Sequence, residues 1–442
     1  MSTQSDEPDE LEDAQRDDSP DTNKVNQDDD TSAAGTDDGI NGSKTPAGDT
    51  GASDVSGDPT ATDYWLLSGL RTPFCKVDGG IADRNAIELS IPVVQEMVQQ
   101  VQDGPDAAVW GEVAPILKYS NIAREIWIDA GLDQSIPSIS TQMACATSMA
   151  AVFDATGLLS GDRSVALCGG VESMSNIQVG MSTEFSNWLR RLTQSSGTGE
   201  MLATLASPRL PKLDIPGVEN RSTGMSMGEH CEEMVKEWDI SRERQDEIAL
   251  ASHENAVDGQ ENGFFDDLVM EVDGVETDAF PRPSTTMDAL SGLPAVFDSD
   301  EGTISPGNSS PLTDGAAGVW LSTEDGLDRF DDSRPRVKLV DWEIAGVDIF
   351  EEGLLMAPAY AIPRLLDRHD MKYDDIDIWE IHEAFAAQIA CHIDALESDS
   401  FLENKVGIEP TFGDFPRDRM NPNGGSVALG HPFGATGARI LS

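Results

Sequence analysis

From Tyr64 onward, short apolar runs alternate with amphipathic segments, and this alternation constrains the fold more than any other feature of the chain. The pattern predicts strands within 64–74, 136–141 and 164–174, and helices within 87–102 and 121–132. Alternating strands and helices favour an α/β fold with a largely central sheet. The same order of strand, reactive residue and helix occurs once in each half, which fits two copies of one α/β unit.

The composition divides the chain further. Residues 1–63 hold 18 acidic and 3 basic side chains and no aromatic residue, so we expect a disordered acidic tail. Residues 64–300 are predicted to form a first half, in which the Met-rich, Pro-punctuated stretch 178–300 is an inserted cap or loop region. Residues 301–442 are predicted to form a second half, with a strand at 334–346, a helix at 357–370, a strand at 376–383 and a helix at 384–398.

The charge excludes several partners. The chain carries 81 acidic and 29 basic side chains, a formal net charge of -52, and residues 64–442 alone keep 63 acidic and 26 basic side chains. Such a surface repels nucleic acid and anionic membranes, and it is typical of proteins that work in a salt-rich cytoplasm. The sequence has no signal-peptide pattern and no long apolar run, so we expect a cytoplasmic, halophilic protein.

The cysteines and histidines point to one reactive thiol. Five scattered cysteines without a C-x-x-C pair make a disulfide framework or a zinc site improbable. Cys145 lies between a β-branched stretch and a helix, where the helix dipole is expected to lower the thiol pKa. His382 and His431 follow predicted strands, and the other four histidines fit structural roles. A cysteine with a neighbouring histidine base is a standard activated nucleophile.

Five segments together resemble the thiolase family. The segment 142–155 (QMACATSMAAVFDA) resembles its nucleophile motif, 381–388 (IHEAFAAQ) its Asn/His-Glu-Ala-Phe motif, and 423–439 (NGGSVALGHPFGATGAR) its Gly-His-Pro motif. Segments 222–234 and 302–321 resemble the loop domain and the start of the second half. The matches come in family order over about residues 64–442, and the histidine variant is most similar to β subunits of fatty-acid-oxidation complexes.

The resemblance implies two stacked, five-layered α-β-α-β-α halves with an inserted loop domain. It implies an acyltransferase that cleaves 3-ketoacyl-CoA or condenses acyl-CoA molecules, with no resident cofactor or metal. Cys145 would carry the acyl group, His431 would take the thiol proton, and His382 would help to form an oxyanion hole. Met227 and Phe385 would contact the substrate. Ser426 and Gly430 are expected to shape the turn that aims His431.

The resemblance also implies partners and a further thiol. A homo-oligomer, a dimer or a tetramer, is expected, and a hydratase/dehydrogenase or a small complementing subunit is a candidate partner. Thiolases carry a second catalytic cysteine some dozens of residues after the Gly-His-Pro motif, whereas this sequence stops 11 residues after His431. We expect a C-terminally truncated chain; a continuing sequence, a second polypeptide and a degenerate protein stay open as explanations.

Two other functions stay open. The chain would be a non-catalytic or half-competent acyl-CoA-binding subunit if a second chain must supply the missing thiol. It would be a condensing enzyme of the ketoacyl synthase type if its two histidines serve a Cys-His-His site.

Overall fold

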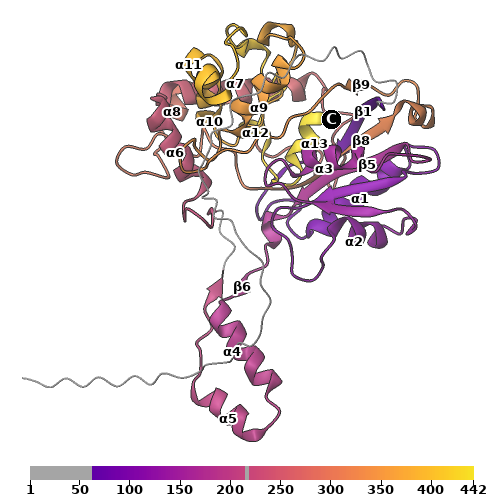
Figure 1. Cartoon of the computed structure of the whole chain (residues 1–442), viewed down its shortest axis with the longest axis vertical. Helices are drawn as coiled ribbons and strands as arrows, with labels where there is room; N and C mark the ends of the chain where they lie inside the picture. Colours follow the sequence, from indigo (N-terminus) through magenta and orange to yellow (C-terminus); the bar gives the residue numbers. More distant parts are fainter. Residues whose placement is uncertain (1–61, 215–218) are drawn as a thin grey trace, which may run out of the picture. The chain divides into compact units, whose positions relative to one another are not determined.

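The computed structural model describes residues 62–214 and 219–442. The acidic tail predicted for 1–63 therefore lies almost wholly outside the described residues. Figure 1 labels the helices and several of the strands of the described part. No helix there is long and apolar enough to span a bilayer.

The strands form one large sheet and one small one. The large sheet has the order β4-β3-β5-β8-β1-β9, with β2 also paired to β8, and the small one joins β6 to β7. Neighbours β4, β3 and β5 run parallel, whereas β8, β1 and β9 join through antiparallel ladders. The bounds are β1 Tyr64–Arg71, β2 Cys75–Lys76, β3 Ala107–Gly111, β4 Ser138–Thr141, β5 Val165–Glu172, β6 Gly180–Met181, β7 Leu213–Asp214, β8 Thr313–Thr323 and β9 Arg336–Leu339.

Helices alternate with these strands along the chain, as the sequence pattern predicts. Several begin at a side-chain cap; for α1, Asn85 and Glu88 form a reciprocal capping box. The bounds are α1 Ala86–Val98, α2 Ile122–Asp129, α3 Thr147–Thr156, α4 Thr183–Gln194, α5 Thr198–Ala206, α6 Met227–Trp238, α7 Arg242–Glu261, α8 Met287–Ser291, α9 Ala357–Asp367, α10 Ala386–Leu396, α11 Asp399–Phe401, α12 Ser426–Leu429 and α13 Thr436–Leu441.

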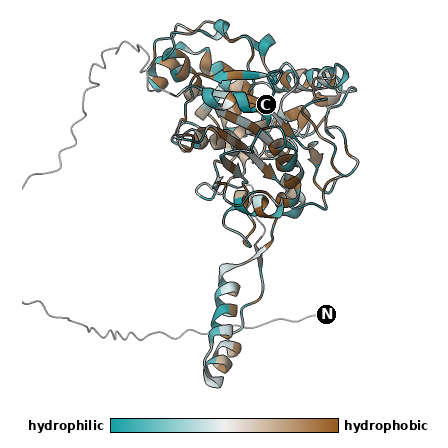
Figure 2. Cartoon of the chain, turned by 90° about the vertical axis from the view of Figure 1, so that its right-hand side faces the viewer, coloured by the Kyte–Doolittle hydropathy of each residue, from teal (hydrophilic) through white to brown (hydrophobic). Residues whose placement is uncertain are grey.

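Two hydrophobic clusters cover the two faces of the large sheet. One joins the sheet to α1 and α2 through residues such as Leu89, Met97 and Trp127. The other joins the opposite face to α3 and α13, where small residues such as Ala151 and Ala438 allow close packing. Figure 2 shows brown, hydrophobic helices and strands within the folded body of the chain. The α/β fold class is thus confirmed, with the sheet buried between helices.

The second half differs from the expected repeat of the first. Within the described residues it supplies β8 and β9 to the large sheet, and its helices α9 and α10 pack into clusters with α6 and with the segment around Phe412. The stretch 376–383, predicted as a strand, makes only an isolated bridge between Trp379 and Met420. Here the Asn421 side chain bonds both the N–H and the C=O of Ile381, so an asparagine satisfies backbone groups that a strand neighbour would pair.

The predicted cap region, 178–300, contains α4 to α8. Helices α4 and α5 bury none of their side chains and contact each other, since the Trp188 indole donates to the Thr204 carbonyl at 2.9 Å. Helices α6 and α7 instead pack on α10 through buried residues that include Cys231 and Ala249. Through α7 the region reaches the residues around His382.

Candidate active site

The site forms at the carboxyl ends of three parallel strands. Cys145 follows β4 by four residues, Glu112 comes directly after β3, and Glu172 is the last residue of β5. Parallel strands end at the same edge of a sheet, where α/β proteins usually bind ligands. The edge therefore brings one thiol and two carboxyl groups into one region.

The Cys145 thiol is presented by a tight turn between β4 and α3. Ala144 has a φ of 45°, in the left-handed region that alanine rarely adopts. Thr147 holds this conformation, because its hydroxyl donates to the Ala144 carbonyl at 2.7 Å and accepts the Met143 N–H at 2.9 Å. Strained backbone of this kind persists where surrounding contacts fix it and is frequent at functional sites.

His431 is aimed by a second turn, between α12 and α13. Gly430 has a φ of 100°, and a Cβ there would lie 2.9 Å from the Phe280 ring, so the position requires glycine. The His431 N–H donates to the Thr313 hydroxyl at 3.0 Å, which fastens the turn to β8. The expected role of Gly430 in shaping this turn agrees with the geometry.

His382 is fixed through its neighbour Glu383. The Glu383 carboxylate is 1% exposed and accepts hydrogen bonds from Ser252 of α7, from Asn421 and from the Val427 N–H of α12. Three separate segments therefore meet at one buried carboxylate, which sets the course of the backbone that carries His382.

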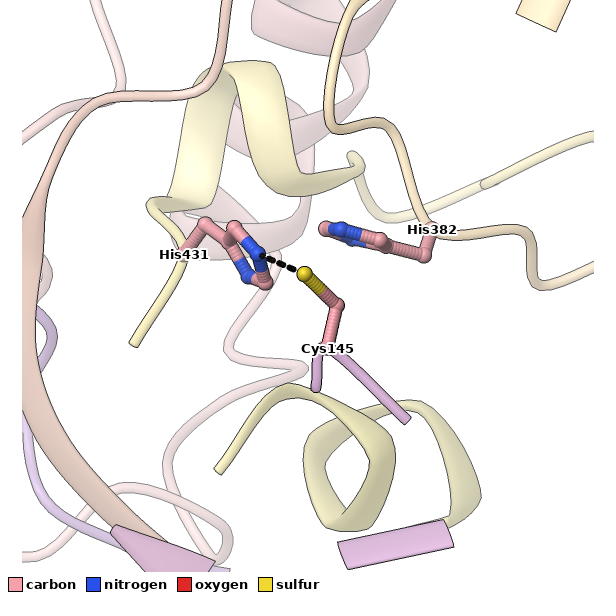
Figure 3. A group of neighbouring side chains, drawn as sticks. All are labelled: Cys145, His382 and His431. Carbon is pink, nitrogen blue, oxygen red and sulfur yellow. Dashed lines mark hydrogen bonds between the residues drawn. The ribbon is translucent and has the colours of Figure 1, made fainter. Parts of the chain in front are cut away.

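The three predicted catalytic side chains converge, as Figure 3 shows. The His431 Nε2 atom lies 3.2 Å from Cys145 Sγ, and the centroids of the two histidine rings are 4.0 Å apart. The nearest ligand atoms of all three residues lie within 4.8 Å of one another, so this group also has the composition of a metal site. His431 thus forms one cluster with His382, 49 residues earlier in the sequence, and with Cys145, 286 residues earlier.

Hydrogen bonds to Thr436 define the protonation of His431. The Thr436 hydroxyl donates its proton to the Pro432 carbonyl at 3.0 Å, and its oxygen lies 2.7 Å from His431 Nδ1. Because the hydroxyl proton is already used, Nδ1 carries the ring proton and donates it to Thr436. The unprotonated Nε2 then faces the Cys145 thiol and is able to accept its proton.

The opposite arrangement holds at His382. Its Nδ1 lies 2.8 Å from the Ser426 hydroxyl oxygen, which also accepts from Arg439 at 3.3 Å. In the tautomer in which the Ser426 hydroxyl donates to Nδ1, the ring proton sits on Nε2 and is available as a donor. The sequence assigned Ser426 only to turn shape; the structure corrects this, because Ser426 orients a histidine ring.

Burial keeps the thiol and both imidazoles neutral. It raises the pKa of Cys145 to about 11, and the Glu172 carboxylate adds to the shift. Burial also lowers the pKa of His382 to about 3 and that of His431 well below its usual 6.5, with the Arg439 guanidinium adding to both. The expectation that the helix dipole lowers the thiol pKa was wrong, because desolvation outweighs a short helix whose N-cap lacks a side-chain bond.

Glu172 holds together the loops that surround the site, a role that the sequence analysis did not predict. Its carboxylate is 2% exposed and accepts the N–H groups of Val113, Ala114 and Gly434, at 3.1, 3.0 and 3.1 Å. Gly434 packs so closely that a Cβ there would lie 2.3 Å from the Val171 carbonyl oxygen. Glu172 thus joins β5, the loop after β3 and the loop of His431. A carboxylate after a Gly-Gly strand end was the available signal.

The two predicted substrate-contacting residues belong to a different cluster. Phe385 is 8% exposed and packs edge-to-face on Phe297 at 6.0 Å, and Met227, at the start of α6, packs partly buried against the same cluster. Both side chains therefore pack among the buried residues of α6, α9 and α10.

The remaining thiols lie in the cores. All five cysteines fall within the described residues; Cys75, Cys168, Cys231 and Cys391 are buried in hydrophobic clusters, and Cys145 is only partly buried. Burial raises the pKa of each of the four buried thiols. Cys145 is thus the cysteine that lies beside histidine side chains, at the end of a strand and only partly buried.

Comparison with known proteins gives a consistent result. The family model described as "Thiolase, N-terminal domain" matches residues 65–325, and "Thiolase, C-terminal domain" matches 333–442. A 3-ketoacyl-CoA thiolase of Pseudoalteromonas translucida is 35% identical over 397 residues, 85% of this chain and 89% of that protein. One of Yersinia enterocolitica is 34% identical over 389 residues, with the same coverage.

Solved structures show the same fold. The acetyl-CoA acetyltransferase of Bacillus anthracis matches with a TM-score of 0.69 and 28% identity, over 86% of this chain and 91% of that one. Human mitochondrial 3-ketoacyl-CoA thiolase in complex with CoA matches with a TM-score of 0.67 and 23% identity, over 86% and 89% of the two chains. Two family models that together cover most of the chain, and relatives above 30% identity, show that the chain belongs to the thiolase family of acyltransferases.

Proposed function

We propose that the chain carries an acyl group on Cys145 and exchanges it between 3-ketoacyl-CoA and CoA, as a thiolase of the fatty-acid-oxidation β-subunit type. The observation that carries the proposal is the 3.2 Å approach of His431 Nε2 to the Cys145 sulfur, with Nδ1 bonded to Thr436. His382, in the position of the family asparagine, supports the subtype.

In this proposal, Cys145 Sγ attacks the keto carbonyl carbon while its proton passes to His431 Nε2. The carbonyl oxygen becomes an oxyanion, and the Nε2–H of His382 donates a hydrogen bond to it. This donor atom is buried and has no partner among the described residues, so it is free for that role. Attack by the CoA thiol on the resulting thioester then returns Cys145 to its free form.

The carbon–carbon step needs one more group. When the bond breaks, the departing acetyl-CoA enolate must take a proton, and the four other thiols of the described residues are buried in cores. This favours a second candidate function, a half-competent subunit that forms the acyl-enzyme and receives the second thiol from a second chain.

Several broader expectations belong to the same proposal. CoA and its thioesters are the substrates, without a resident cofactor. Substrate contact by Met227 and Phe385 stays a prediction, because both side chains pack in the cluster of α6, α9 and α10. The chain forms a homo-oligomer in a salt-rich cytoplasm, with 64–300 and 301–442 as its two halves. A hydratase/dehydrogenase is a candidate partner enzyme.

A thiolysis assay tests the proposal. With acetoacetyl-CoA and CoA, we expect acetyl-CoA to form and Cys145→Ser to abolish it. His369→Asn is a matched control, because His369 is an exposed histidine that contacts Asp341. Activity that persists in Cys145→Ser would disprove the proposed nucleophile. Acyl transfer to Cys145 without carbon–carbon cleavage would favour the half-competent subunit.

A further inference from the structure

The same three side chains form a set of metal ligands. Cys145 offers one sulfur and His382 and His431 offer one ring nitrogen each, all within 4.8 Å of one another. Thiolate and imidazole are the ligands that Zn²⁺ prefers, at about 2.3 and 2.0–2.1 Å, so atoms around one tetrahedral ion lie about 3.5 Å apart. The 3.2 Å between Cys145 Sγ and His431 Nε2 is close to that spacing.

The surroundings of the histidines independently favour a ligand. The Nε2 atom of His382 is buried and has no hydrogen-bond partner among the described residues, and Figure 3 shows the His382 ring beside the Cys145 sulfur. The other nitrogen of each ring contacts a hydroxyl, that of Ser426 at 2.8 Å for His382 and that of Thr436 at 2.7 Å for His431. Metal-binding histidines are commonly oriented in this way through their second nitrogen.

We propose that Cys145, His382 and His431 bind one soft divalent cation, Zn²⁺ or Co²⁺, and that the bound ion reversibly inhibits the enzyme. Binding releases the Cys145 thiol proton to solvent, and no electron is transferred. His382 takes the tautomer in which Nδ1–H donates to Ser426, which frees Nε2 for the ion. Three protein ligands leave a fourth position open to water.

This inference differs from the sequence-based expectation that the chain has no metal site. Only its inhibitory half rests on the proposed function, because the ion would occupy the proposed nucleophile, base and oxyanion donor. The binding half rests on geometry alone. The two halves therefore need separate measurements.

Cobalt titration measures binding without any assay of activity. Under anaerobic conditions, Co²⁺ added to the purified chain should produce tetrahedral d–d bands and a thiolate-to-cobalt charge-transfer band that saturate at one ion per chain. Zn²⁺ should displace the cobalt and remove both signals. Cys145→Ser should lose the charge-transfer band, and His382→Asn should weaken binding at least about tenfold. Thr436→Val, which keeps all three ligands, should weaken it roughly 10- to 100-fold.

Matched controls separate this site from other thiols and histidines. Cys391→Ala removes a buried thiol of α10 and His369→Asn an exposed imidazole, and neither should change the spectrum. A charge-transfer band that persists in Cys145→Ser, or the absence of any band in the unaltered chain, would overturn the inference. Cobalt binding to a chain that Zn²⁺ does not inhibit would overturn its inhibitory half.

The outcomes also separate this inference from the proposed function. Acylation of Cys145 in a chain that binds no cobalt contradicts only the metal site. Cobalt binding by a chain whose Cys145 is never acylated supports the metal site and contradicts the proposed function. Prior alkylation of Cys145 with iodoacetamide should block cobalt binding, and unaltered binding after complete alkylation would contradict the assigned ligands.

Discussion

The thiol of Cys145 and the imidazole of His431 lie 3.2 Å apart, yet burial opposes a charge on either of them. Separating charge between two desolvated groups costs more than in water. The resting site therefore holds a neutral pair, and the proton moves from sulfur to nitrogen as the sulfur attacks. His382 adds a donor for the charge that appears on the substrate oxygen.

The pH dependence of Cys145 alkylation tests this neutral pair. With a raised pKa of about 11, the thiolate fraction grows about tenfold per pH unit across the neutral range. The rate of carboxymethylation by iodoacetamide, followed by mass spectrometry of the Cys145 peptide, should therefore rise from pH 6 to pH 10 without a plateau. Cys145→Ser is the control for labelling of the four buried thiols. A plateau below about pH 8 would indicate a preformed thiolate.

Sequence motifs predicted all three residues of the site but not their protonation. Cys145 follows strand β4 as predicted, whereas the predicted strands before His382 and His431 were wrong: an irregular stretch precedes His382, and helix α12 precedes His431. Ser426 and Thr436 each act through one hydrogen bond, to the ring of His382, 44 residues away, and to the ring of His431, 5 residues away. No pattern of residue types in the sequence indicates such a bond. The pKa shifts depend on burial by distant segments, which only the folded chain provides.

At the scale of elements, Glu172 couples the end of β5 to the loop that carries His431. Its carboxylate accepts N–H groups from two loops, and Glu112 lies nearby with its own partner, the Tyr119 hydroxyl at 2.9 Å. Burial raises the pKa of both carboxyl groups to about 7. The two residues are similar in type, burial and place, and the Glu112 backbone also packs on Gly434, but it is the Glu172 carboxylate that accepts the Gly434 N–H.

Substitution of these two residues tests that coupling. Glu172→Gln replaces one of the two acceptor oxygens by an NH₂ group, so at least one of the three N–H groups bonded to Glu172 loses its acceptor. We expect acylation of Cys145 to slow about tenfold, the effect of about one hydrogen bond. Glu112→Gln still accepts from Tyr119 and should change the rate less than about twofold. Stopped samples analysed by mass spectrometry give both rates. Equal slowing in the two variants would show that a general loss of packing, and not the contact to Gly434, is responsible.

Elements of the first half were predicted more fully than those of the second. The sequence pattern predicted strands β1, β4 and β5 and helices α1 to α3. In each of them apolar residues recur at the spacing of a strand or a helix, and a neighbouring element covers the apolar face. The segment 376–383 has the same β-branched composition, yet strand formation depends on a partner strand. In its place, Asn421 satisfies the backbone of Ile381, a long-range contact that periodicity does not reveal.

At the scale of the whole molecule, the acidic excess extends well beyond the first 63 residues. Residues 64–442 hold 63 acidic and 26 basic side chains, so the folded chain repels itself at low ionic strength. Screening shortens the reach of this repulsion from about 10 Å at 0.1 M salt to about 3 Å at 1 M. The α/β class itself followed from the alternation of strands and helices, which charge does not alter.

Thermal unfolding at increasing salt tests the proposal that the chain is adapted to salt. Between 0.1 and 2 M KCl we expect the unfolding midpoint to rise by on the order of 10 °C, because the folded state gains more from screening than the expanded chain. Circular dichroism follows the transition, and NaCl should act like KCl if screening is the cause. A midpoint that stays constant or falls would contradict a halophilic protein.

The formation of an acyl-enzyme on Cys145 tests the central claim most directly. The 442-residue chain is incubated with acetyl-CoA, digested and analysed by mass spectrometry. We expect one acetyl group on the Cys145 peptide, its loss on addition of CoA, and at least about 100-fold slower formation in His431→Asn, which removes the base. An unmodified Cys145, or acetylation that proceeds at the same rate in His431→Asn, would contradict it.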